Sequence, residues 1–139
     1  DVRRKKTMPR RHKAPPKQTQ TMMLNCSFES QCATWFMQGG WQVFTPLLDC
    51  GHKTDLIVSD GPSFYRIQTK TLATATLDVE VPNLWKGSDV DYVIYFAKGS
   101  NYWGWIIPAF TQSKMKLKNA GGARFEHSKP SFLKAFHSL

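Results

Sequence analysis

The sequence is poor in the residues that build disulfide scaffolds and transition-metal sites. Its 139 residues include three cysteines, Cys26, Cys32 and Cys50, and no two of them have the CxxC spacing. The four histidines are scattered along the chain. An odd number of widely spaced cysteines argues against a disulfide framework and against a zinc ribbon. We therefore expect buried thiols and surface imidazoles.

Long apolar runs are also absent. No stretch approaches the length of a membrane span, and the N-terminal residues lack the apolar segment of a signal peptide. The chain is nevertheless 41% hydrophobic and 13% aromatic, which suits one domain with a core of ordinary size. We expect a soluble, cytoplasmic protein with no membrane partner.

Positive charge is in excess, with a formal net charge of +9, and it is unevenly distributed along the chain. Residues 1–17 hold eight bases and one acid, residues 29–110 hold five bases and eight acids, and residues 114–134 hold six bases and one acid. Basic ends attract polyanions, whereas an acidic centre repels them unless a cation neutralises it. This pattern favours a nucleic-acid partner and a divalent cation.

The composition divides the chain in two. Residues 1–22 are rich in Lys, Arg, Pro, Gln and Thr, which predicts a basic disordered arm, and residues 23–139 form the predicted folded domain. Two interpretations of the arm stay open. It is a solubilising tail or start-site artefact, or it is a segment that lies on DNA or RNA.

Apolar periodicity predicts a helix, several strands and a second helix, which together make a mixed α/β fold. The first helix spans 25–38, is capped by Asn25 or Ser27, ends at Gly39-Gly40, and buries Phe28, Cys32, Trp35 and Phe36. Strands are expected at 41–46, 55–59, 64–71, 89–97 and 102–108. Residues 73–82 are a weak strand or a crossover, residues 111–128 are irregular, and residues 129–139 are a helix with Phe132, Leu133 and Phe136 inward.

The segment "TDLIVSDGPSFYRIQTK", residues 54–70, predicts a hairpin with surplus polar groups. A turn centred between Gly61 and Pro62 places Asp55 opposite Gln68, and alternation then puts Arg66 and Lys70 on the same face. Two interpretations stay open here as well. This face is an ordinary solvated surface, or it is a site.

The site interpretation rests on the chemistry of these side chains. A carboxylate can hold Mg²⁺, and a lysine two residues beyond a second ligand can orient a water for hydrolysis of a phosphodiester. Glu29, beside the buried stripe of the first helix, adds a second carboxylate if that helix packs on the sheet. Taken alone, Glu29 is equally a favourable acid in a first helical turn.

The ordered set of a helix with Glu29, "DLIV", "GPSFYRIQTKT", "DVDYVIYFA" and "YWGWIIP" resembles the PD-(D/E)XK nucleases over about residues 25–108. It is most similar to the small group I intron-encoded homing endonucleases of bacterial or phage mobile elements. The resemblance implies a restriction-endonuclease-like core, a mixed central β-sheet flanked by helices. It also implies a Mg²⁺-dependent (or Mn²⁺-dependent) endonuclease that cuts double-stranded DNA at a specific site as a dimer or tetramer.

By this resemblance, Asp55 matches the acidic metal ligand, Lys70 the motif lysine and Glu29 the supplementary helix carboxylate. Gln68 occupies the (D/E) position and would be the third metal ligand. Thr54 stands where the motif has proline, and a glutamine at position 68 is similar to what the intron-encoded branch carries. Because an amide oxygen is neutral, less negative charge would hold each metal.

Other residues are expected to support the site or to contact DNA. Asp89 and Asp91 are predicted to be strand-start or supporting residues, and Trp103 and Trp105 core or interface aromatics. Six cations are candidates for phosphate contacts: Lys53, Arg66, Lys114, Lys116, Lys118 and Arg124. Three alternatives remain: a structure-selective nuclease of the Holliday junction type, a non-catalytic DNA-binding protein of the same fold, and a basic RNA-binding module.

Overall fold

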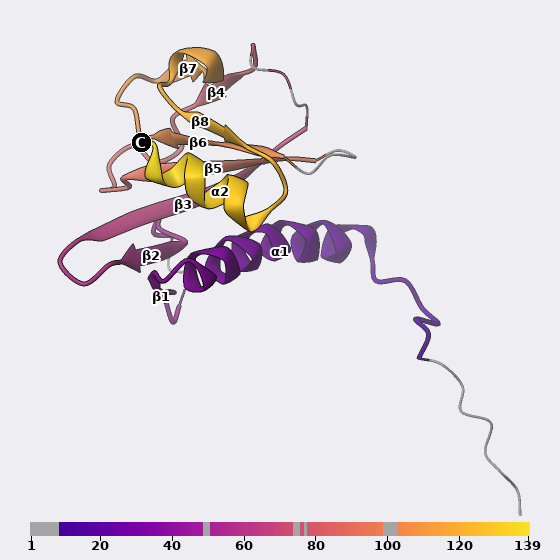
Figure 1. Ribbon diagram of the computed structural model, residues 1–139. Coiled ribbons are helices and arrows are strands. Elements are labelled where there is room, and N and C mark those ends of the chain that lie inside the picture. Colours follow the sequence, from indigo (N-terminus) through magenta and orange to yellow (C-terminus); the bar gives the residue numbers. More distant parts are fainter. Residues whose placement is uncertain (1–8, 49–50, 74–75, 77, 99–102) are drawn as a thin grey trace, which may run out of the picture.

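The structure, a computed structural model, describes residues 9–48, 51–73, 76, 78–98 and 103–139. Figure 1 shows its helices and strands. Their order along the chain is α1 (Lys17–Gln38), β1 (Gln42–Phe44), β2 (Leu56–Ser59), β3 (Phe64–Leu72), β4 (Glu80–Pro82), β5 (Tyr92–Ala97), β6 (Gly104–Pro108), β7 (Lys114–Lys116), the 3₁₀ turn η1 (Leu117–Asn119), β8 (Ala123–Phe125) and α2 (Lys129–His137).

The central sheet is mixed, as predicted. Its six strands lie in the order β1-β2-β3-β5-β6-β8. The β3–β5 pair is parallel, and every other neighbouring pair in this sheet is antiparallel. Strands β4 and β7 form a separate two-stranded antiparallel sheet. The chain crosses from β3 to β5 through β4, so one of the two strands of the small sheet lies in the crossover.

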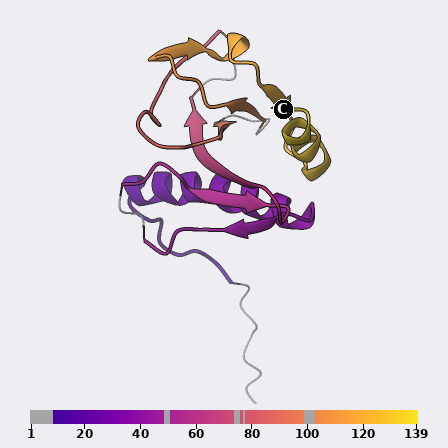
Figure 2. The ribbon, with the colours of Figure 1, turned by 90° about the vertical axis from the view of Figure 1, so that its left-hand side faces the viewer.

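Both helices pack on the same face of the central sheet, as the two views in Figures 1 and 2 show. The core on this face joins Phe28 of α1 and Phe132 of α2 to Leu56, Ile67 and Phe96 of the sheet. A second core lies on the other face and covers Val93, Tyr95 and Ile107 with Val81, Trp85 and Leu117 from the β4–β7 side. The central sheet is therefore buried on both faces, by helices on one and by the small sheet on the other.

Helix α1 has the predicted buried stripe but starts earlier than predicted. Phe28, Cys32, Trp35 and Phe36 are its buried residues, and Gly39 caps its end, as expected. The start is at Lys17, after Pro16, with no side-chain cap, so capping by Asn25 or Ser27 is wrong. Residues 17–22, which we assigned to the arm, are helical because nothing between Lys17 and Gln38 breaks a helix. All side chains from 17 to 27 are exposed.

The hairpin has the predicted register. Leu56 pairs with Ile67, Ile57 with Arg66 and Ser59 with Phe64. Its turn depends on Gly61, whose φ of 111° is costly for any residue with a side chain. The Ser59 hydroxyl accepts a hydrogen bond from the Gly61 N–H at 3.0 Å, which fixes the turn position.

The region 111–128 is more ordered than predicted, because it contains β7, η1 and β8. Each of these strands has three residues, too few to give a periodic signal. Their pairing partners are distant in sequence: β7 pairs with β4, and β8 pairs with β6. In α2, Phe132 and Phe136 are buried as expected, whereas Leu133 is only partly buried and Ala135 is buried instead.

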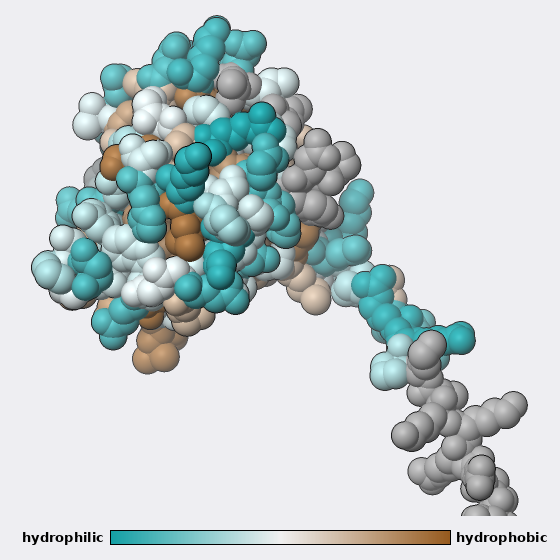
Figure 3. All heavy atoms as spheres, in the orientation of Figure 1, coloured by the Kyte–Doolittle hydropathy of each residue, from teal (hydrophilic) through white to brown (hydrophobic). Residues whose placement is uncertain are grey.

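Most of the surface seen in Figure 3 is hydrophilic, with hydrophobic side chains gathered at its lower edge. Leu47 and Leu48, in the segment between β1 and β2, are 96% and 72% exposed. No helix in the described part of the chain is both long and apolar enough to span a bilayer.

Candidate active site

A cavity of about 340 Å³ lies between α1 and the free edge of β3. Strand β2 pairs with β3 only up to Ile67, whereas β3 continues to Leu72 along β5. The last part of β3 therefore has no strand partner on its β2 side among the described residues. The residues that line the cavity come from three segments and include Cys26, Phe28, Glu29, Asp55, Thr69 and Lys70.

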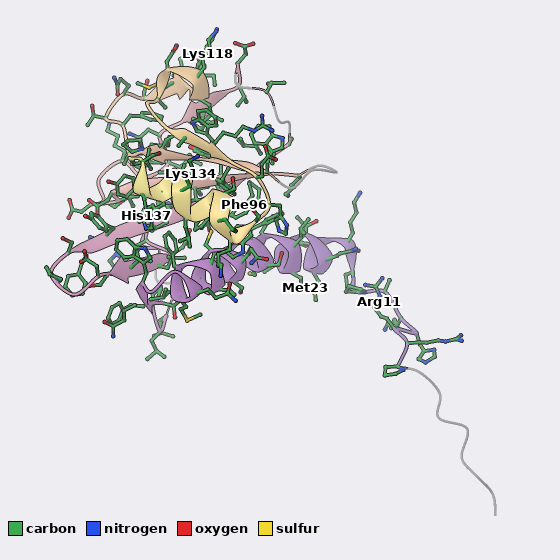
Figure 4. All side chains as sticks on the ribbon, viewed as in Figure 1. Arg11, Met23, Phe96, Lys118, Lys134 and His137 are labelled. Carbon is green, nitrogen blue, oxygen red and sulfur yellow. The ribbon has the colours of Figure 1, made fainter. Side chains whose placement is uncertain are left out.

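Three of the four predicted site residues meet at this cavity. Glu29 comes from α1, Asp55 from the residue before β2, and Lys70 from β3. The turn of α1 that carries Glu29 is held by its neighbour Phe28, which stacks on Phe96 of β5 with ring centroids 4.8 Å apart. Figure 4 labels Phe96 on the helix-covered side of the sheet. Helix α1 therefore places Glu29 at the same cavity as Asp55.

Asp55 is fixed by hydrogen bonds to β3. Its backbone N–H donates to the Ile67 carbonyl at 2.9 Å, which continues the β2–β3 ladder by one bond. Its Oδ2 accepts from the Thr69 N–H at 2.7 Å and from the Thr69 hydroxyl at 3.2 Å. The Asp55 carboxylate thus accepts the Thr69 N–H in place of a backbone carbonyl of β2. Oδ1 takes part in neither bond.

Gln68 is not part of the cavity lining. It is 3% exposed and pairs with Val93, which belongs to the core under β4 and β7. Its Oε1 is buried and has no hydrogen-bond partner among the described residues. An unsatisfied buried acceptor is uncommon and needs a reason. The role of Gln68 as a metal ligand stays a prediction.

The two carboxylates act together on a buried thiol. Burial raises the pKa of Cys32 well above its usual value, and the charges of Glu29 and then Asp55 raise it further. Both acids therefore project negative potential onto the same part of α1. Such a potential favours a cation in the adjoining cavity. In the described part of the chain, no three His, Cys, Asp or Glu side chains are grouped so that they could hold a metal ion.

Most of the predicted DNA-binding cations are paired with acids. Lys118 lies 2.8 Å from Asp78 and lowers its pKa, and Lys114 lies 3.4 Å from Glu80. Lys116, also on β7, is exposed. Figure 4 places Lys118 at the end of the molecule away from α1. The lysines of β7 and η1 therefore do not border the cavity, and their contact with DNA stays a prediction.

Arg124 and Arg66 are also engaged. The Arg124 guanidinium lies 3.1 Å from Glu126 and 4.7 Å from the ring centroid of Trp103, which is buried. The Nε of Arg66 donates to the Thr54 hydroxyl at 2.9 Å, and Nη1 lies 3.7 Å from Asp89.

Asp91 is hydrogen-bonded to β3, and Lys53 remains a candidate phosphate contact. The Asp91 carboxylate accepts the Arg66 N–H at 2.7 Å, and Asp89 lies 3.7 Å from the Arg66 guanidinium; a supporting role for both stays a prediction. Trp105 packs against the second core. Lys53 is exposed two residues before Asp55, which leaves it nearest in sequence to the cavity among the predicted phosphate contacts.

Cys26 and Thr69 are among the lining residues that the sequence did not indicate as site residues. Cys26 is three residues before Glu29, and this spacing alone places both on one helix face. Thr69 lies between Gln68 and Lys70, and its bond to Asp55 depends on where β2 begins, which the sequence does not reveal.

Comparison with known proteins identifies the fold. No protein-family model matches the chain, and no curated protein matches it. A solved structure is similar: the bacterial homing endonuclease I-Ssp6803I, with a TM-score of 0.55 and 17% sequence identity. The match covers 82% of this chain and 86% of that one. The chain therefore has a nuclease-like α/β core, and the particular protein that it is similar to is a homing endonuclease.

Proposed function

We propose that this chain is a metal-dependent, site-specific endonuclease of the homing type that hydrolyses phosphodiester bonds of double-stranded DNA. The observation that carries the proposal is the meeting of Glu29, Asp55 and Lys70 at one cavity. The fold, which is similar to that of a homing endonuclease, supports it. The PD-(D/E)XK assignment and an origin in an intron of a mobile element belong to the same proposal.

The donor set suits Mg²⁺, with Mn²⁺ as a substitute. Carboxylate oxygens are the ligands that this hard cation prefers, and it is commonly held by one or two carboxylates while it keeps several waters. Glu29 and Asp55 supply two carboxylates. Gln68, two residues before Lys70 on β3, has a buried Oε1 with no hydrogen-bond partner among the described residues. Bound Mg²⁺ would neutralise charge on the phosphate and lower the pKa of a water.

Each side chain of the site has a separate task in this proposal. Asp55, held by Thr69, presents a fixed carboxylate. Glu29 contributes the second carboxylate from α1, so the position of the helix determines whether this carboxylate can reach the metal. Lys70 donates hydrogen bonds that orient the attacking water toward the phosphorus. Lys53 is exposed near Asp55 and would hold a neighbouring phosphate.

A second copy of the chain is part of the proposal. Two DNA strands must be cut, and one domain offers one such cavity, so a dimer or tetramer would supply the second site. Arg11, in the segment before α1, lies away from the domain in Figure 4, and the basic residues of this segment would contact DNA beyond the cleavage site.

The test is incubation of the protein with Mg²⁺ and a library of duplexes, followed by sequencing of the ends produced. We expect ends at one recurring sequence for the wild type and none for Asp55→Asn, which keeps the side-chain shape and removes its charge. Ends that are random in sequence, or equal for both proteins, would contradict site-specific cleavage by this cavity. A four-way junction in the same assay separates the structure-selective alternative.

A second candidate function is a non-catalytic DNA-binding protein. It is favoured by the small donor set, since Gln68 is neutral and does not line the cavity. Calorimetric titration with Mg²⁺, with and without DNA, distinguishes the two. Heat of binding that Asp55→Asn abolishes supports the nuclease, and DNA binding with no metal binding supports the second candidate.

A further inference from the structure

Thr69 makes two contacts with one carboxylate oxygen at the cavity. Its backbone N–H and its hydroxyl both donate to Oδ2 of Asp55, at 2.7 and 3.2 Å. Asp55 lies just before β2 and one residue beyond the last β2–β3 residue pair, so its backbone is bonded to β3 but strand pairing does not fix its side chain. The carboxylate therefore takes its orientation from Thr69.

We propose that Thr69 is a positioning residue that holds Oδ2 of Asp55 on β3 by hydrogen bonds and leaves Oδ1 as the single oxygen that holds the cation. This inference rests on the proposed function and deepens it. A carboxylate with one oxygen occupied by two hydrogen bonds binds a cation through the other oxygen alone. Partners that hold a ligand in this way tune metal affinity about as strongly as some ligands do.

Side-chain substitution can test the part of this positioning that comes from the Thr69 hydroxyl, because it does not remove the backbone N–H. Threonine is β-branched and stiff at χ1, so its hydroxyl stays at one position beside the backbone N–H of the same residue. Valine has nearly the same shape and keeps the backbone bond, but it loses the hydroxyl bond. Serine restores the hydroxyl without the methyl group.

The experiment is a calorimetric Mg²⁺ titration of the full chain, followed by cleavage at several Mg²⁺ concentrations. We expect Thr69→Val to weaken Mg²⁺ binding by about tenfold, the low end for such partners, because the Thr69 N–H still holds Oδ2. At saturating Mg²⁺ its cleavage rate should approach that of the wild type. Thr69→Ser should restore most of the affinity.

Thr34→Val is the matched control, since it removes a threonine hydroxyl bonded to the Ser30 carbonyl at 3.0 Å on α1. It should leave Mg²⁺ binding unchanged. Thermal unfolding of each variant separates loss of affinity from loss of fold.

Each other outcome counts against the inference. Wild-type affinity in Thr69→Val, or equally weak binding in Thr69→Ser, would overturn the role of Thr69 while the proposed function stands. A loss of cleavage that saturating Mg²⁺ does not restore would also overturn it. If the wild type binds no Mg²⁺ and cuts no DNA, the proposed function fails and the inference fails with it.

Discussion

Replacement of Gln68 by leucine should make the folded protein more stable and the proposed nuclease less active. Gln68 is 3% exposed, and its Oε1 has no hydrogen-bond partner in the described part of the chain. A buried acceptor left unsatisfied costs roughly 1–3 kcal/mol. Leucine is similar in size, so it should fill the same space with little strain.

The expected gain is about 1 kcal/mol, since the contacts of the amide nitrogen are lost at the same time. For a domain of this size, that raises Tm by roughly 4 °C. The cost falls on function, because natural proteins keep unsatisfied polar groups chiefly where a site needs them. Cleavage by Gln68→Leu should therefore decrease, and Mg²⁺ binding should weaken.

The assay combines thermal unfolding without metal, Mg²⁺ calorimetry and single-turnover cleavage. Gln38→Leu, at an exposed position at the end of α1, is the control and should change stability by less than about 0.5 kcal/mol. A lower Tm for Gln68→Leu would refute the reasoning about the unpaired oxygen. A higher Tm with wild-type cleavage and Mg²⁺ affinity would show that Gln68 takes no part in the site.

Three further predictions concern the thiols, the tyrosines and the sheet. Iodoacetamide should alkylate Cys26, which is exposed and lines the cavity, and should spare the buried Cys32 in the native protein. Peptide mass spectrometry measures the modification of both thiols, and Cys26→Ser should make cleavage resistant to the reagent. Burial raises the pKa of Tyr95 above its usual value of 10.0, so the stability that this residue contributes below about pH 10 is lost as the pH rises above 10. Urea unfolding at pH 9 and pH 11 tests this loss, and equal stability at both pH values would contradict it. Gly104→Ala should cost about 3 kcal/mol, because its Cβ would lie 2.1 Å from the Tyr95 carbonyl oxygen across the β5–β6 pair; an unchanged Tm would contradict this close approach.

The sequence predicts what depends on local pattern. The turn residues set the hairpin register, so the pairing of Ile57 with Arg66 is correct. Helical spacing gives the buried stripe of α1, and the position of Glu29 beside that stripe is enough to bring it to β3.

What the sequence does not predict depends on distant parts of the chain. Strand β7 pairs with the distant β4, and the acids Glu80 and Asp78, which pair with Lys114 of β7 and Lys118 of η1, come from the same crossover as β4. The burial of Gln68 beside Val93 depends on the β3–β5 pairing, which joins segments that are distant in sequence. The contact of Thr69 with Asp55 exists because β2 begins only at Leu56, and no sequence signal marks that residue as the start of the strand.

The central claim is that Glu29, Asp55 and Lys70 act as one site on a DNA phosphodiester. The most direct test is the single-turnover rate of cleavage of the identified duplex, with Mg²⁺ and with EDTA, for the wild type and for Lys70→Ala. We predict cleavage by the wild type with Mg²⁺ only, and a decrease of at least about 100-fold for Lys70→Ala. Full activity of Lys70→Ala, or cleavage that persists in EDTA, would contradict the account.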